Sequence, residues 1–167
     1  MTITLEDFSN QVRNFLLDDP GPNGREKARL LLQEVLVDKE FTEQHIHDDQ
    51  PQREVLYHDP DLGFAILAHV YHAAKQTQPH DHGVSWAIYG QVAGESLVQD
   101  WEIVEQASAE VPGKVRQKGA RVLSPGIAIT YNEGDIHSPS RQGPAKLIRI
   151  EGKHIQEVKR FSWDIVE

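Results

Sequence analysis

From residue 53 onward, the sequence consists of short runs of β-branched and aromatic residues separated by turn-forming residues. The breakers include the segments DPDLG, VPG, SPG, NEGD and RQGP, whose proline, glycine and aspartate residues favour turns. Many short strands at this spacing are typical of a sandwich or barrel. We therefore predict a mainly β, antiparallel barrel. The predicted strands are residues 53–58, 63–72, 84–89, 95–105, 115–122, 127–131, 137–141, 146–151 and 158–163.

The residues before these strands show helical periodicity instead. Apolar side chains recur at helical spacing over residues 4–17 and again over residues 28–36, which predicts two amphipathic helices. The cluster DDPGPNG at residues 18–24 separates the two patterns, because proline and glycine interrupt a helix. Residues 39–45 can form a third short helix, and residues 45–52 read as a linker. These helices are too few to cover both faces of a parallel sheet, so we expect them to pack outside the barrel.

Length and composition narrow the organisation and the partners. A chain of 167 residues suits one core, so we expect a single domain over residues 1–167, with a helical segment at 1–50 and the barrel at 51–167. The net charge of -9 argues against nucleic acid and against an anionic membrane as partners. No cysteine is present, which excludes disulfides and thiolate metal ligands. The first residues, MTITLEDF, do not resemble a secretory signal, so we expect a cytoplasmic protein.

The sequence contains two HxH pairs, in each of which a single residue separates two histidines. His80 and His82 precede a predicted strand, and in extended backbone residues i and i+2 point to the same face, so both imidazoles can reach one ion. His45 and His47 have the same spacing but lie in the polar linker, where we expect them to be solvated. The spacing alone is therefore a weak signal, and its surroundings must decide.

The surroundings of the second pair resemble the cupin superfamily. In cupins a first motif supplies HxH, a carboxylate four or five residues later and then a glycine, and a second motif supplies a glycine turn before the last histidine. This chain matches at His80, His82, Gly94, Gly134 and His137. The resemblance spans roughly residues 78–138, and it implies the cupin double-stranded β-helix, or jelly-roll barrel, with these three histidines as metal ligands.

The match lacks the glutamate ligand of the family, because Trp86 and Ala87 stand in its place. A three-histidine site is the pattern of the cysteine dioxygenase-like (thiol dioxygenase) and diketone-cleaving cupins. The resemblance therefore implies a non-haem iron(II) dioxygenase acting with dioxygen on a small thiol, carboxylate or diketone-like substrate. It also allows a homodimer.

Three neutral imidazoles leave a divalent ion with its full charge and with open positions, so an anionic substrate can bind beside oxygen. The same ligands suit zinc, manganese or nickel. The alternatives are thus a zinc, manganese or nickel cupin with isomerase, hydrolase or lyase activity, and a cupin that binds a metal or ligand without catalysis.

Candidate catalytic residues follow from strand parity. Leu147, Arg149 and Glu151 share one face of a predicted strand. If this face looks inward, Arg149 can bind a substrate anion while Glu151 orients it or moves a proton; the alternative is an exposed ionic face. Tyr89 is a further candidate for proton transfer. Trp86 and Tyr131 either line the cavity or serve as packing.

The chain departs from the thiol dioxygenases in two respects. Those enzymes use an arginine for the substrate carboxylate, where this chain offers His58 or Asp59. They also use a Ser-His-Tyr set, where this chain has Leu147, Arg149 and Glu151. A plain cysteine dioxygenase is therefore not the expectation. Of the remaining histidines, we expect His69 and His72 to be core or edge residues, of which at most one points inward, and His154 to be solvated.

Overall fold

The computed structural model describes residues 2–153 and 160–167. Within these residues three helices precede ten strands, one strand more than the sequence predicts. The helices are α1 (Leu5–Asp18), α2 (Pro22–Val37) and α3 (Lys39–His45). The strands are β1 (Arg53–His58), β2 (Ala65–Tyr71), β3 (Lys75–Gln76), β4 (Ala87–Ala93), β5 (Ser96–Glu105), β6 (Gly113–Leu123), β7 (Ala128–Tyr131), β8 (Ile136–Arg141), β9 (Ala145–Glu151) and β10 (Trp163–Ile165).

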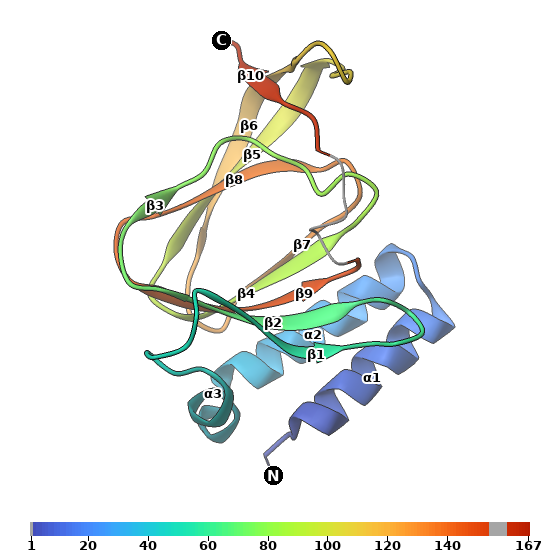
Figure 1. Cartoon of the computed structure of the whole chain (residues 1–167), viewed down its shortest axis with the longest axis vertical. Coiled ribbons are helices and arrows are strands. Elements are labelled where there is room, and N and C mark those ends of the chain that lie inside the picture. The colour runs from blue at the N-terminus through green and yellow to red at the C-terminus, as the bar shows by residue number, and fades with distance from the viewer. Residues whose placement is uncertain (1, 154–159) are drawn as a thin grey trace.

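The strands form two five-stranded sheets that face one another (Figure 1). One sheet has the order β1-β2-β9-β4-β7 and the other has the order β10-β6-β5-β8-β3. All pairings between these strands are antiparallel except the one between β10 and β6. This arrangement confirms the predicted mainly β class and the double-stranded β-helix.

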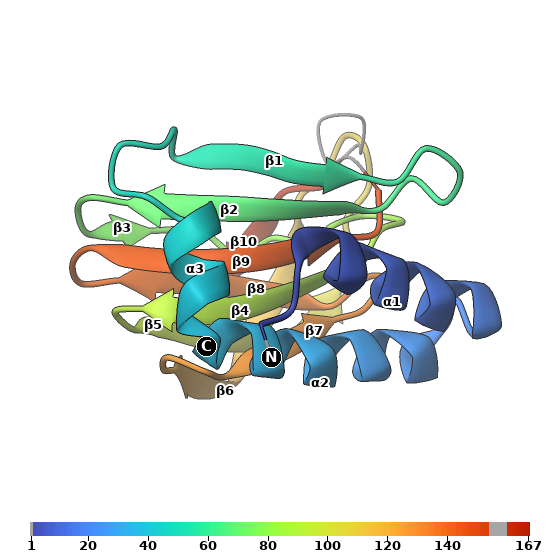
Figure 2. The same cartoon turned by 90° about the horizontal axis from the view of Figure 1, so that it is seen from below.

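The helices cover the outer face of the first sheet, as Figure 2 shows from below. Phe8 and Val12 of α1 and Leu32 of α2 pack in one cluster with the fully buried Ile148 and Ile150 of β9. Burial of this apolar face, at roughly 25 cal/mol per Å² removed from water, joins the helical segment to the barrel. The helices therefore pack outside the barrel, as expected. Among the described helices, none has the length and apolar character needed to cross a bilayer.

This packing determines which side chains of β9 point into the barrel. Because Ile148 and Ile150 face the helices, Leu147, Arg149 and Glu151 face the interior between the sheets. Leu147 and Glu151 are buried, and the side chain of Arg149 is only 12% exposed. The alternative of an exposed ionic face is thus wrong.

Several boundaries differ from the sequence prediction. Helix α2 begins at Pro22, inside the cluster expected to be a breaker, because proline at the first helical turn loses no hydrogen bond. Strand β4 begins at Ala87 instead of residue 84, because Gly83 has φ 58° and the Ser85 amide donates to the His82 carbonyl in a turn. The two-residue strand β3 was not predicted. The strand predicted over 158–163 lies partly outside the described residues, and β10 begins at Trp163.

Candidate metal centre

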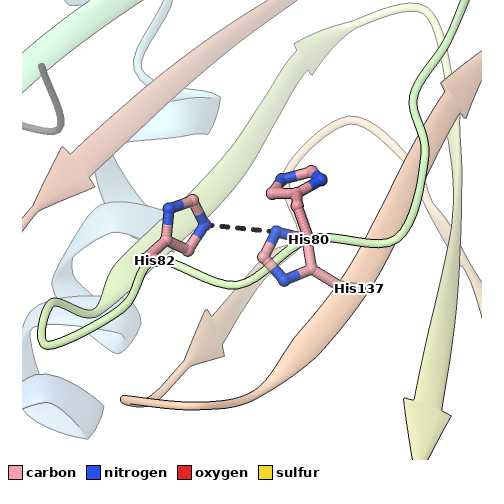
Figure 3. A group of neighbouring side chains, drawn as sticks. All are labelled: His80, His82 and His137. Atoms are coloured by element: carbon pink, nitrogen blue, oxygen red, sulfur yellow. Dashed lines mark hydrogen bonds between the residues drawn. The ribbon is translucent and has the colours of Figure 1, made fainter. Parts of the chain in front are cut away.

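The three predicted ligands come together from two distant segments (Figure 3). His137 lies on β8, and His80 forms an isolated antiparallel bridge with it through two N–H···O bonds of 3.0 Å. His82 follows in the same loop, between Asp81 and the turn glycine Gly83. One ring nitrogen of each histidine lies within 4.8 Å of the others. The Nε2 atoms of His82 and His137 are 3.2 Å apart.

The loop that carries the HxH pair is fixed by the aspartate between the two histidines. Asp81 accepts a hydrogen bond from the Gly83 amide at 2.8 Å and from the Trp163 indole nitrogen at 3.2 Å. Because Trp163 belongs to β10 and His80 pairs with β8, the loop is held from both sides. The ligands are therefore positioned by the barrel itself.

The protonation of the three rings suits metal binding. Burial lowers the pKa of His80, His82 and His137, so all three are neutral at physiological pH and offer lone pairs. His80 donates from Nδ1 to the Gln78 carbonyl at 2.9 Å, which leaves its Nε2 as an acceptor. The Nδ1 atom of His82 is buried without a hydrogen-bond partner among the described residues, and the Nε2 atoms of His82 and His137 face each other in the cluster.

The distance between the nitrogens of His82 and His137 also fits a metal ion. Two nitrogens 3.2 Å apart can each bind one ion at about 2.1 Å with an angle near 100°, which lies between octahedral and tetrahedral values. Imidazole suits iron, zinc and nickel alike, so the donor set fits a divalent transition metal without selecting one. Within the described residues no carboxylate joins this group.

The position of the missing glutamate is accounted for by parity. Trp86 packs in the cluster under the helices, where the guanidinium of Arg25 lies 5.2 Å from its ring, so it does not reach the histidines. Ala87 faces the interior but has no donor atom, and Tyr89 on the same face of β4 places its hydroxyl 3.0 Å from His82 Nε2 and 3.3 Å from His137 Nε2. Burial raises the pKa of Tyr89, so its hydroxyl is protonated in the absence of a metal.

Tyr131 supports His137 from the other side. Its ring stacks on the imidazole with centroids 3.8 Å apart and an interplanar angle of 14°. Its hydroxyl donates to Asp100 at 3.0 Å and accepts from Arg121 at 3.3 Å. Tyr131 thus packs against a ligand inside the barrel and is anchored by a polar network.

A cavity of about 500 Å³ opens beside the histidines. His80 and Tyr89 line it together with Arg149 and Glu151, so the two candidate catalytic residues of β9 do face this space. The guanidinium of Arg149 lies 4.7 Å from the centre of the Tyr89 ring, and its Nε is 3.1 Å from a Glu151 oxygen. The other Glu151 oxygen accepts a hydrogen bond from Arg53 at 2.9 Å.

Sequence reasoning missed several residues of this cavity. Arg53, Tyr71, Lys75 and Arg141 also line it. One signal was available, since Arg141 is four residues from His137 on the same strand and therefore shares its face.

The other histidines divide as parity predicts. His69 is buried and lines the cavity, where burial and nearby cations lower its pKa to about 2, whereas His72 is exposed. The Nδ1 atom of His69 lies 3.3 Å from the Tyr71 hydroxyl, so His69 contacts another residue of the cavity wall and none of the metal ligands. His47 is exposed and His45 is half-buried against Phe41, so this pair stays apart from the metal centre. His154 lies outside the described residues.

His58 and Asp59, which stand where the thiol dioxygenases have their substrate-binding arginine, lie outside the cavity lining. His58 is exposed, and Asp59 is buried in a hydrogen-bonded ion pair with Arg13 of α1 at 2.6 Å. Burial raises the pKa of Asp59, but hydrogen bonds from the Leu62 amide and Arg13 outweigh this effect and lower it to about 2. Asp59 therefore fastens helix α1 to the end of β1.

No protein-family model matches the sequence, and no curated protein matches it. Solved structures do resemble it. A cupin superfamily protein from Desulfitobacterium hafniense is 12% identical, with 64% of this chain and 80% of that chain covered at a TM-score of 0.43. KdgF from Halomonas sp. is 20% identical, with 65% and 87% covered at 0.44. An oxalate oxidase is 18% identical, with 71% and 59% covered at 0.46. Cupin superfamily proteins are thus among the solved structures similar to this chain.

Proposed function

We propose that this protein is a non-haem iron(II) dioxygenase that acts on a small anionic organic substrate, of the thiol, carboxylate or diketone-like class. The observation that carries the proposal is that three neutral imidazoles lie together at the wall of a cavity that is lined by arginines. Neutral ligands leave the charge of the ion uncompensated, and the guanidinium groups add further attraction for an anion.

His80, His82 and His137 would hold the ion through the nitrogens that face one another. Bound iron(II) would supply the redox chemistry with dioxygen. The contribution of the chain is to keep this centre dry on one side, since His82 and His137 are fully buried, and open on the cavity side, where His80 is part of the wall.

Arg149 is the proposed residue for binding the substrate anion. Its guanidinium lies over the Tyr89 ring, and the hydroxyl of that ring touches two ligand nitrogens, so an anion on Arg149 lies next to the metal centre. Glu151 holds Arg149 and Arg53 in place from a fully buried position. Tyr89 is positioned to hold a proton at its hydroxyl beside the reacting group.

The proposal is tested with protein purified without a polyhistidine tag or a nickel column. We expect about one iron per chain by elemental analysis, and oxygen uptake with at least one member of a panel of thiols, carboxylates and β-diketones. His82→Ala should lose both metal and oxygen uptake. His47→Ala is the matched control, because it belongs to the other HxH pair and is exposed, and it should retain both.

Full metal content in His82→Ala would contradict the assignment of the centre. Zinc, manganese or nickel in place of iron, without oxygen uptake, would favour the alternative of an isomerase, hydrolase or lyase. Metal binding without turnover of any compound would favour a metal- or ligand-binding cupin.

A further inference from the structure

The cavity beside the histidines has a charge opposite to that of the whole chain. Five basic side chains line it, whereas Glu151 is its one acidic side chain among the described residues. The basic residues are Arg53, Lys75, Arg141, Arg149 and Arg160. This excess of four formal positive charges occurs in a protein whose net charge is -9. The cavity therefore selects anions.

The charges of the cavity are not equally compensated. Arg53 and Arg149 both contact Glu151, at 2.9 and 3.1 Å. Arg141 is only 4% exposed, and it forms no ion pair with any described residue. Its Nε is buried without an acceptor within the described part of the chain. A buried cation without an anion is costly, and this cost is recovered when an anionic ligand binds.

Arg141 belongs to a separate pole of the cavity, which we call the distal pole and define as Tyr71, Lys75 and Arg141. The Arg141 guanidinium lies 4.2 Å from the centre of the Tyr71 ring, and the Lys75 ammonium lies 5.4 Å from it. Lys75 and Arg141 are also register partners between β3 and β8. Two cations thus share one aromatic platform, with no carboxylate paired to either among the described residues.

The distal pole is distinct from the arginine beside the metal centre. Arg141 is four residues along β8 from His137, which places their Cα atoms about 13 Å apart. Pro139, on the same face between them, lines the cavity as well. Arg149, in contrast, lies over Tyr89, whose hydroxyl touches two of the metal-binding nitrogens. The two arginines thus come from different strands and lie over different aromatic rings, Tyr71 and Tyr89, so the cavity offers two anion-binding positions.

We propose that the substrate is a small dianion of the dicarboxylate type. One anionic group binds at Arg149 beside the three histidines, and the second binds at the distal pole through Arg141 and Lys75. This inference rests on the proposed function for the chemistry at the first group, whereas the second position stands on the geometry of the distal pole alone.

Isothermal titration calorimetry at low ionic strength tests the proposal on the full chain, both as purified and after metal removal. Succinate, glutarate and adipate are compared with butyrate, pentanoate and hexanoate, the monocarboxylates of equal length. We expect at least one dicarboxylate to bind about 10-fold more tightly than its partner, or about 1.4 kcal/mol, because the monocarboxylate lacks the charged group that Arg141 and Lys75 would bind.

Arg141→Gln should abolish the advantage of the dicarboxylate and leave the affinity for the monocarboxylate within about 2-fold. Lys75→Gln, at an exposed position that is less prone to disturb folding, should reduce the advantage by about 3-fold. Arg116→Gln is the matched control, since Arg116 is exposed and pairs with Glu102 on the same sheet but away from the cavity lining, and it should change nothing.

Equal affinities for dicarboxylates and monocarboxylates, or a dicarboxylate advantage that survives in both the Arg141 and Lys75 variants, would overturn the inference. Metal content and oxygen uptake, measured on the same preparations, keep the two proposals separate. A dicarboxylate advantage in protein that binds no metal supports the distal pole and refutes the dioxygenase. Metal and oxygen uptake without the advantage refute the distal pole alone.

Discussion

Replacement of Tyr131 separates two roles of an aromatic ring that stacks on a candidate metal ligand. The ring is 3% exposed and lies face to face with His137 at 3.8 Å, and the hydroxyl is tied to Asp100 and Arg121. Tyr131→Phe removes the hydroxyl and keeps the stack. Tyr131→Leu removes both.

The expected magnitudes follow from these contacts. Loss of the hydroxyl should reduce the free energy of unfolding by about 1 kcal/mol, since a hydrogen bond contributes roughly 0.5–1.5 kcal/mol. An aromatic pair contributes roughly 0.5–1.5 kcal/mol beyond its buried area. If the stack holds the imidazole of His137 in its binding orientation, Tyr131→Leu should raise the dissociation constant of the metal by about 2- to 12-fold. Tyr131→Phe should leave that constant within about 2-fold.

Competition titration against a chromophoric chelator measures the metal affinity, and urea unfolding of the metal-free protein measures stability independently. The reasoning would be refuted if Tyr131→Leu lost stability but bound metal as tightly as the unmodified protein, because the ring would then serve only as packing. An equal loss of affinity in Tyr131→Phe would assign the effect to the hydroxyl instead of the stack.

Four further substitutions or treatments give defined expectations. In Gly90→Ala the new Cβ would lie 2.8 Å from a leucine methyl of α2, so we expect urea unfolding to show a loss of about 1–3 kcal/mol. Gly119→Ala meets nothing within 4 Å and should change stability by less than about 0.5 kcal/mol. The folded protein lowers the pKa of Asp59 to about 2, so the ionised carboxylate stabilises the fold above the unfolded pKa of about 3.9, and this contribution is lost as pH falls through about 2. The difference in stability between the unmodified protein and Asp59→Asn should therefore shrink between these two pH values, in acid titrations followed by circular dichroism. A chelator should lower the melting midpoint of the unmodified protein and leave that of His82→Ala unchanged. If metal is present at 100 times its dissociation constant, its removal should reduce the free energy of unfolding by about 2.7 kcal/mol.

The sequence predicted the elements whose limits are set by local chemistry. Residues 39–45 and 53–58 form α3 and β1 with the predicted bounds, because a capping aspartate begins the helix and turn residues flank the strand. The third ligand was predicted through the resemblance to cupins, and the glycine turn of that pattern is present, since Gly134 has a φ of 79° before His137. Local signals were sufficient for the two elements, whereas the ligand depended on the family pattern.

The cavity was less predictable because it depends on which way each strand face turns. Parity alone placed Arg149 and Glu151 on one face but did not say whether that face was inside. Tertiary packing decides this. Ile148 and Ile150 pack against the helices, so Arg149 and Glu151 on the opposite face point into the barrel. Arg141 was missed because an arginine near a strand end is more often exposed than buried.

The overall charge of the chain and the charge of its cavity lead to different expectations about anions. A net charge of -9 repels an extended polyanion, which must approach the whole surface to gain affinity. A small dianion needs only the cavity of about 500 Å³, where the cations are within a few ångströms of it. At physiological salt, exposed charges are screened over about 8 Å, whereas partly buried charges are screened much less. The exterior therefore contributes little to the binding of a small ligand, and the expectation that nucleic acid is not a partner is compatible with an anionic substrate. The total charge thus disfavours large polyanions, whereas the arginines of the cavity favour the small dianion that we propose.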